Sequence, residues 1–210
     1  MPQSLQFYFD LMSPYAYLAH ARLPALAADH GLVLDYQPVD LARLKLLAGN
    51  TGPGNRDIAI KHRYLRQDLR RWADFYGVPF CPPAGYGSAR INAGALYARD
   101  RGLCQPYTEW IWGRVWGEGR AMDDDALLRE AAAHFEWPER EFTGFVALPE
   151  AAQRLAAGTQ AAHEAGVFGV PTMRLDSELW WGNDRLEFLE RHLAVRAPTG
   201  KAPPAALAGT

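Results

Sequence analysis

The sequence predicts an α/β fold in which a βαβ unit begins the chain, a ββα unit ends it and an all-helical block separates the two. Two observations predict this order. Alternating apolar and polar residues, typical of strands, occur only near the two ends, whereas residues 41–165 carry apolar residues at helical spacing. The 210 residues, 49 % hydrophobic and 22 % charged, have a globular composition and can bury a core without a disulfide or a metal.

The N-terminal unit begins with a strand and continues into a capped helix. Residues 5–9 alternate between large apolar and more polar side chains, which predicts the strand. Ser13-Pro14 then supplies an N-cap and a proline at the first helical position. The helix is expected to kink at Pro24 and to stop at Gly31, before a second strand over residues 32–37. Such a βαβ unit predicts a parallel pair of strands with a right-handed crossover.

The middle of the chain predicts helices and no strand. A proline-rich loop is expected over residues 78–86. The expected helices span residues 58–76, 88–101, 106–116, 124–135 and 149–165.

The C-terminal unit returns to strands. Apolar residues on both sides of the polar residues 176–178 predict a hairpin. Asn183 or Asp184 is expected to cap a last helix whose leucines continue to residue 193. The order βαβ…ββα is that of a thioredoxin-like fold interrupted by an all-helical insertion subdomain.

These patterns divide the chain into three parts. Residues 1–40 together with residues 166–196 are expected to form the thioredoxin-like domain, and residues 41–165 the helical insertion. Residues 197–210 are rich in alanine, proline and glycine and lack apolar periodicity, which predicts a disordered tail.

Charge and cysteine content narrow the partners and the compartment. A net charge of -2 without a Lys/Arg stripe argues against nucleic acid, and no apolar run approaches the ~20 residues of a membrane span. Cys81 and Cys104 form no C-x-x-C pair and no signal peptide precedes them, which predicts free thiols in a reducing cytoplasm. The six histidines show no ligand spacing, so no metal is expected.

Three separated runs carry a family resemblance. They are FYFDLMSPYAY at residues 7–17, GVFGVPTM at residues 166–173 and WGNDRL at residues 181–186. In order and separation, across nearly the whole chain, they resemble the 2-hydroxychromene-2-carboxylate isomerase family and the related kappa-class glutathione transferases of the DsbA-like thioredoxin lineage. The resemblance implies an enzyme with glutathione as cofactor, a small aromatic carboxylate as substrate, and a homodimer.

Ser13 occupies the position at which a thioredoxin-type oxidoreductase would carry its reactive cysteine. A helix N-terminus presents free N–H groups and favours an anion such as a thiolate. Serine remains protonated there, but its hydroxyl can donate a hydrogen bond to a thiolate, and the resemblance makes glutathione the source of that thiolate. The alternative is that Ser13 is only a helix cap.

Two further runs are expected to bind glutathione by resemblance. The Val170-Pro171 bond is expected to be cis, so that the Val170 backbone pairs with the glutathione peptide as a strand would. Alternatively, Pro171 is an ordinary trans proline at an edge strand. The turn Gly182-Asn183-Asp184-Arg185 is expected to hold the γ-glutamyl end, with Asp184 against the α-ammonium; as a bare pattern it is a loop with a cap.

The substrate side is expected to come from the helical insertion. By resemblance, four polar residues are assigned to the substrate: Lys45, Asn50, Thr51 and Asn92. The alternatives are a solvated loop for the first three and a polar helix face for Asn92. Charged residues of the 58–76 helix are expected to be solvated. Trp72, Trp110, Trp112 and Trp116 are expected to pack in the core rather than to line an aromatic pocket.

The resulting hypothesis is a glutathione-dependent isomerase of aromatic compound degradation that interconverts 2-hydroxychromene-2-carboxylate and trans-o-hydroxybenzylidenepyruvate, or a close analogue, by reversible thiolate addition. A kappa-class-like glutathione transferase or peroxidase is the first alternative, and a non-catalytic thioredoxin-fold binding module is the second. The polar region around Lys45 and Asn50 favours an anionic substrate and therefore the isomerase. Ser13 and Ala16, at the two expected cysteine positions, argue against a disulfide oxidoreductase.

Overall fold

A computed structural model describes residues 3–196, so the tail expected at residues 197–210 lies outside the described residues. The described strands form a single four-stranded sheet of order β2-β1-β3-β4. β1 is parallel to β2 and antiparallel to β3, and β3 and β4 form the predicted hairpin. The strand bounds are β1 Ser4–Phe9, β2 Val33–Pro38, β3 Thr172–Leu175 and β4 Glu178–Trp181.

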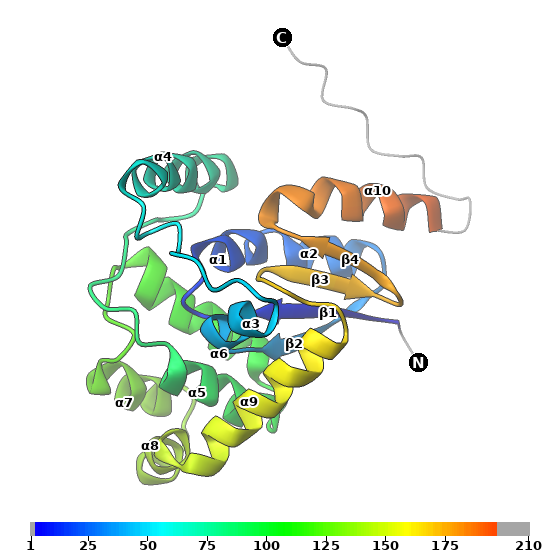
Figure 1. Ribbon diagram of the computed structural model, residues 1–210. Coiled ribbons are helices and arrows are strands. Elements are labelled where there is room, and N and C mark those ends of the chain that lie inside the picture. Colours follow the sequence, from blue (N-terminus) through cyan, green and yellow to red (C-terminus); the bar gives the residue numbers. More distant parts are fainter. Residues whose placement is uncertain (1–2, 197–210) are drawn as a thin grey trace.

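Helices cover both sides of this sheet, with α10 along one side and α9 along the other (Figure 1). α1 Pro14–His20, α2 Leu23–Asp29 and α10 Leu186–Arg196 belong to the βαβ and ββα units. The helices between β2 and β3 are α3 Leu41–Leu47, α4 Ala59–Tyr76, α5 Ala89–Arg99, α6 Cys104–Trp112, α7 Asp125–His134, α8 Glu139–Ala147 and α9 Pro149–Glu164. The element order is therefore the predicted βαβ, helical block and ββα.

Three local expectations were wrong. In place of a kink at Pro24, the helix breaks at residues 21–22, and Pro24 lies in the first turn of α2, where a missing N–H is harmless. Neither Asn183 nor Asp184 caps α10 with its side chain; residues Asn183–Arg185 instead form a 3₁₀ turn that leads into the helix. α3 and α8, of seven and nine residues, were not expected because they are too short for a clear apolar period.

One apolar cluster joins the sheet to the helical block. Phe7 and Phe9 of β1 are fully buried, and the Phe9 ring lies 5.5 Å from that of Trp112 on α6. Trp112 and Trp116 are each 1 % exposed, which confirms core packing for these two tryptophans. No helix among residues 3–196 is long and apolar enough to cross a membrane.

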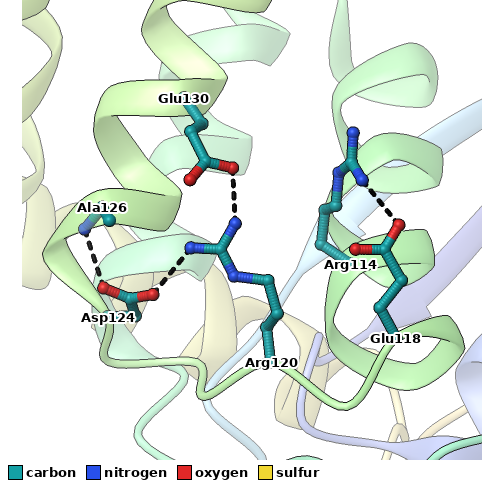
Figure 2. Close-up of polar contacts among 6 residues, drawn as sticks. All are labelled: Arg114, Glu118, Arg120, Asp124, Ala126 and Glu130. Atoms are coloured by element: carbon teal, nitrogen blue, oxygen red, sulfur yellow. Dashed lines mark hydrogen bonds and ion pairs between the residues drawn. The ribbon is translucent and has the colours of Figure 1, made fainter.

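The last turn of α6 widens into a π-helical segment, Gly113–Gly117, that carries Trp116. The chain after it is tied to the start of α7: Arg120 contacts both Asp124 and Glu130, and Asp124 accepts a hydrogen bond from the Ala126 N–H at 2.8 Å (Figure 2). Half-exposed ion pairs of this kind contribute at most about 1 kcal/mol each. Their effect is to fix the path of the chain that follows Trp116.

Candidate active site

Four segments that carry predicted site residues meet at one end of the sheet. Tyr8 of β1 pairs with Thr172 of β3, which pairs with Trp181 of β4, and Phe9 pairs with Pro38 of β2. Four connections therefore meet at this end of the sheet: the turn after β1, the segment before β3, the turn after β4 and the helix after β2. The sheet register alone brings together Ser13, the Val170-Pro171 bond, residues 182–185 and α3.

Ser13 is the N-cap of α1, as its position before Pro14 predicted. Its Oγ accepts a hydrogen bond from the Ala16 N–H at 3.2 Å, and its own N–H donates to the Asp10 carbonyl at 2.8 Å. The first turn of α1 carries no acidic residue of its own, and its N-terminus favours a bound anion. A serine hydroxyl has one donor and two acceptor sites, so the cap bond leaves the O–H free to donate.

The Val170-Pro171 peptide bond is cis, as expected. Both residues are buried, and the Pro171 carbonyl accepts a hydrogen bond from the Gly182 N–H at 2.9 Å. This bond joins the two runs that were assigned to glutathione.

The turn after β4 contains an unsatisfied buried donor. Gly182 has φ +110°, a backbone conformation that strongly favours glycine. Asn183 is 4 % exposed and its Nδ2 has no hydrogen-bond partner among residues 3–196. Buried polar groups nearly always have a partner, so this amide is suited to a bound ligand. Asp184 and Arg185 are exposed and pair with each other at 2.7 Å.

A group of residues between α1 and α4 was not among the site residues predicted from the sequence. The Tyr15 hydroxyl donates a 2.6 Å hydrogen bond to Asp68 Oδ2. Burial, and then the hydrogen bond to the Asp68 carboxylate, raise the pKa of Tyr15. Asp68 follows Lys61 and Tyr64 at helical spacing on α4, and that spacing was the available signal.

An open hollow of about 410 Å³ adjoins this group. Lys61, one of the charged residues expected to be solvated, lines it together with Tyr64 of α4 and Tyr15 of α1. The remaining lining residues are Asn55, Ile60 and Leu65. The hollow therefore borders Tyr15, which is two residues after Ser13.

The structure separates the four expected substrate residues into two groups. Lys45 is exposed in the last turn of α3, and Asn50 and Thr51 follow it in an exposed loop, where the Asn50 N–H donates to the Lys45 carbonyl at 2.9 Å. Asn92 on α5 is 1 % exposed, and both ends of its amide bond protein groups. Its burial leaves no polar atom for a substrate.

The chain is similar to known proteins over nearly its whole length. A family description, DSBA-like thioredoxin domain, matches residues 4–194. The chain is 45 % identical over 186 residues to a 2-hydroxychromene-2-carboxylate isomerase of Pseudomonas putida, covering 89 % of this chain and 92 % of that protein. A solved structure of a 2-hydroxychromene-2-carboxylate isomerase superposes with a TM-score of 0.88 at 44 % identity, covering 92 % and 95 % of the two chains.

A more distant relative is human glutathione S-transferase kappa 1, which is 24 % identical over 221 residues and is matched along 98 % of this chain and 96 % of its own length. The thioredoxin-like fold with a helical insertion is thereby confirmed, as is the enzyme class. The chain belongs to the 2-hydroxychromene-2-carboxylate isomerase family, a group of isomerases within the DsbA-like thioredoxin lineage.

Proposed function

We propose that this isomerase uses glutathione to interconvert 2-hydroxychromene-2-carboxylate and trans-o-hydroxybenzylidenepyruvate, or a close analogue. The observation that carries the proposal is the meeting of Ser13, Val170 and the turn 182–185 at one end of the sheet. A tripeptide bound across that end of the sheet would reach Ser13, Val170 and the turn 182–185.

The donor set fits glutathione. The orphaned Asn183 amide can donate to the γ-glutamyl carboxylate, while Asp184 and Asp68 offer two carboxylates for the α-ammonium. The Val170 backbone would pair with the cysteinyl peptide unit. In this arrangement the γ-glutamyl end would be held by residues 183–184 and the thiol would face Ser13.

When bound, glutathione supplies a thiolate whose reversible addition to the conjugated enone acid allows rotation about the former double bond. Ser13 would donate its hydroxyl proton in a hydrogen bond to the sulfur, which favours the thiolate and lowers the thiol pKa. Lys45 would neutralise the substrate carboxylate and the negative charge that develops on the adjoining oxygen. Asn50 and Thr51, next to Lys45, would bind the substrate hydroxyl groups.

A kappa-class-like transferase is the second candidate, supported by the relatives at 21–25 % identity. It would use the same thiolate site but release a glutathione conjugate. Loss of free glutathione with time distinguishes it, because an isomerase regenerates the thiol in every turnover.

We expect reduced glutathione to raise the melting temperature of the protein. At 100 times its Kd the ligand should add about 2.7 kcal/mol, which for a chain of this size is on the order of 5–10 °C. Asp184→Asn should weaken binding roughly 10-fold because a charged hydrogen bond is lost. The matched control is Glu139→Gln, an exposed carboxylate on α8, which should leave the titration unchanged. If millimolar glutathione leaves the melting temperature unchanged, glutathione is not the cofactor of this protein.

A further inference from the structure

Three backbone groups of Leu11 and Met12, in the turn before Ser13, form hydrogen bonds with buried side chains. The Leu11 N–H donates to Asn92 Oδ1 at 3.0 Å, and the Met12 N–H donates to Asp10 Oδ1 at 2.9 Å. The Leu11 carbonyl accepts from two buried indoles, Trp112 Nε1 at 3.2 Å and Trp116 Nε1 at 3.0 Å. The segment that presents Ser13 is therefore fixed from the helical insertion as well as from β1.

Asp10 connects this turn to the substrate side. Its carboxylate is 1 % exposed, and none of residues 3–196 forms an ion pair with it. Oδ1 accepts from the Met12 N–H and from Asn92 Nδ2 at 2.8 Å, while Oδ2 accepts from the Leu41 N–H at 2.9 Å. Leu41 is the first residue of α3, the helix that carries Lys45.

Asn92 completes the network from α5. Its Oδ1 accepts a hydrogen bond from the Leu11 N–H, and its Nδ2 donates one to Asp10 Oδ1. The same Nδ2 lies 3.3 Å from Ser88 Oγ and 3.4 Å from the Val39 carbonyl. The amide oxygen meets a donor, the Leu11 N–H, and the amide nitrogen meets an acceptor, Asp10. A carboxylate at residue 92 would instead repel Asp10 because both carry negative charge. One side chain thus connects the turn, Asp10 and the insertion.

Burying a carboxylate without a cation costs free energy, which is recovered here only through hydrogen bonds to three different segments. Apolar side chains would fill the same space at lower cost. What the polar pair adds is a fixed register between the turn before Ser13 and the start of α3.

We propose that Asp10 and Asn92 are positioning residues that hold Ser13 in register with α3, so that the thiol side and the substrate side of the active site keep a working distance. This inference rests on the proposed function. Neither side chain touches substrate or cofactor in this account. Both act through backbone atoms: Asp10 through Met12 and Leu41, and Asn92 through Leu11.

The test compares Asp10→Asn and Asn92→Ala with Tyr107→Phe. The Tyr107 hydroxyl donates to the Ile91 carbonyl at 3.0 Å, so its loss removes an equally buried hydrogen bond beside Asn92 without touching the turn or α3. Three quantities are measured in the full-length proteins: stability, kcat at saturating glutathione, and the pKa of the enzyme-bound glutathione thiol from its thiolate absorbance.

Asp10→Asn and Asn92→Ala should lower kcat about 100-fold, the loss expected from a displacement of about 1 Å. Asn92→Ala, which changes no charge, should also raise the bound-thiol pKa, while Tyr107→Phe changes stability alone. Folded variants with wild-type kcat and thiol pKa would overturn the inference and leave the pair a purely structural role.

If the polar variants do not fold, Trp116→Phe keeps an aromatic ring in the core and removes one of the two indole donors to the Leu11 carbonyl. It should then raise the thiol pKa and lower kcat, and wild-type values in it overturn the inference. Wild-type enzyme without any bound thiolate would instead overturn the proposed function, and this inference with it.

Discussion

Replacing Ser13 by alanine is expected to lower kcat about 10- to 100-fold at saturating glutathione and substrate. The reason is the loss of a hydrogen bond to a charged sulfur, which contributes about 1.5–3 kcal/mol, and each 1.36 kcal/mol is tenfold in rate. The bound-thiol pKa should rise as well, so the deficit should shrink as the pH is raised. Steady-state rates measured across pH check both expectations.

The N-cap function of Ser13 requires its own control. Alanine also removes the bond to the Ala16 N–H and should cost about 1 kcal/mol of stability, whereas glycine at an N-cap costs only a few tenths. Ser13→Gly should therefore lose activity as Ser13→Ala does while keeping most of the stability. Wild-type turnover in both variants at every pH would reduce Ser13 to a helix cap.

The second large effect concerns stability in acid and originates at His20. This side chain is 6 % exposed, lies among the rings of Phe7, Tyr36 and Trp112, and has its Nε2 2.6 Å from the Tyr36 hydroxyl. Burial lowers the pKa of His20 to about 3 from 6.5. The unfolded chain therefore binds more protons between these two values, so the stability from neutral His20 is complete above pH 6.5 and is lost as the pH falls.

At about 1.36 kcal/mol per pH unit, His20 should account for a loss of about 2–3 kcal/mol between pH 7 and pH 4.5. The double variant His20→Phe/Tyr36→Phe removes both polar partners and should abolish this part of the acid sensitivity. Tyr36→Phe alone keeps the imidazole and should keep the loss. Urea unfolding of the three proteins at both pH values measures it, and equal acid losses in wild type and double variant would refute the assignment to His20.

Much of the fold could be predicted from local chemistry. The alternation in β1, the Ser13-Pro14 helix start and Gly77 at the end of α4 each depend on residues close in sequence, and each was found where expected. The hairpin around residues 176–178 is another local signal that was confirmed. Short elements such as α3 escaped because seven residues carry no clear apolar period, and part of the support for its start, Asp10 on the Leu41 N–H, is distant in sequence.

The site was predicted only in part. The cis bond before Pro171 and the place of Ser13 followed from matching runs, but Tyr15 and Asp68 are 53 residues apart and meet only through packing of α1 on α4. Asn92 shows the converse error. A polar residue on a helix was assigned to substrate, yet its partners Leu11 and Asp10 lie more than 80 residues away and bury it completely. Sequence spacing cannot reveal such a long-range network.

Catalysis by a bound glutathione thiolate is tested by the rate of isomerisation by glutathione-free enzyme under three conditions: without addition, with glutathione, and with S-methylglutathione. We expect turnover only with glutathione, whose free concentration stays constant, and inhibition by the S-methyl compound, which occupies the same groups but has no thiol. Equal rates in all three conditions, or equal rescue by S-methylglutathione, would contradict catalysis by a glutathione thiolate held at Ser13.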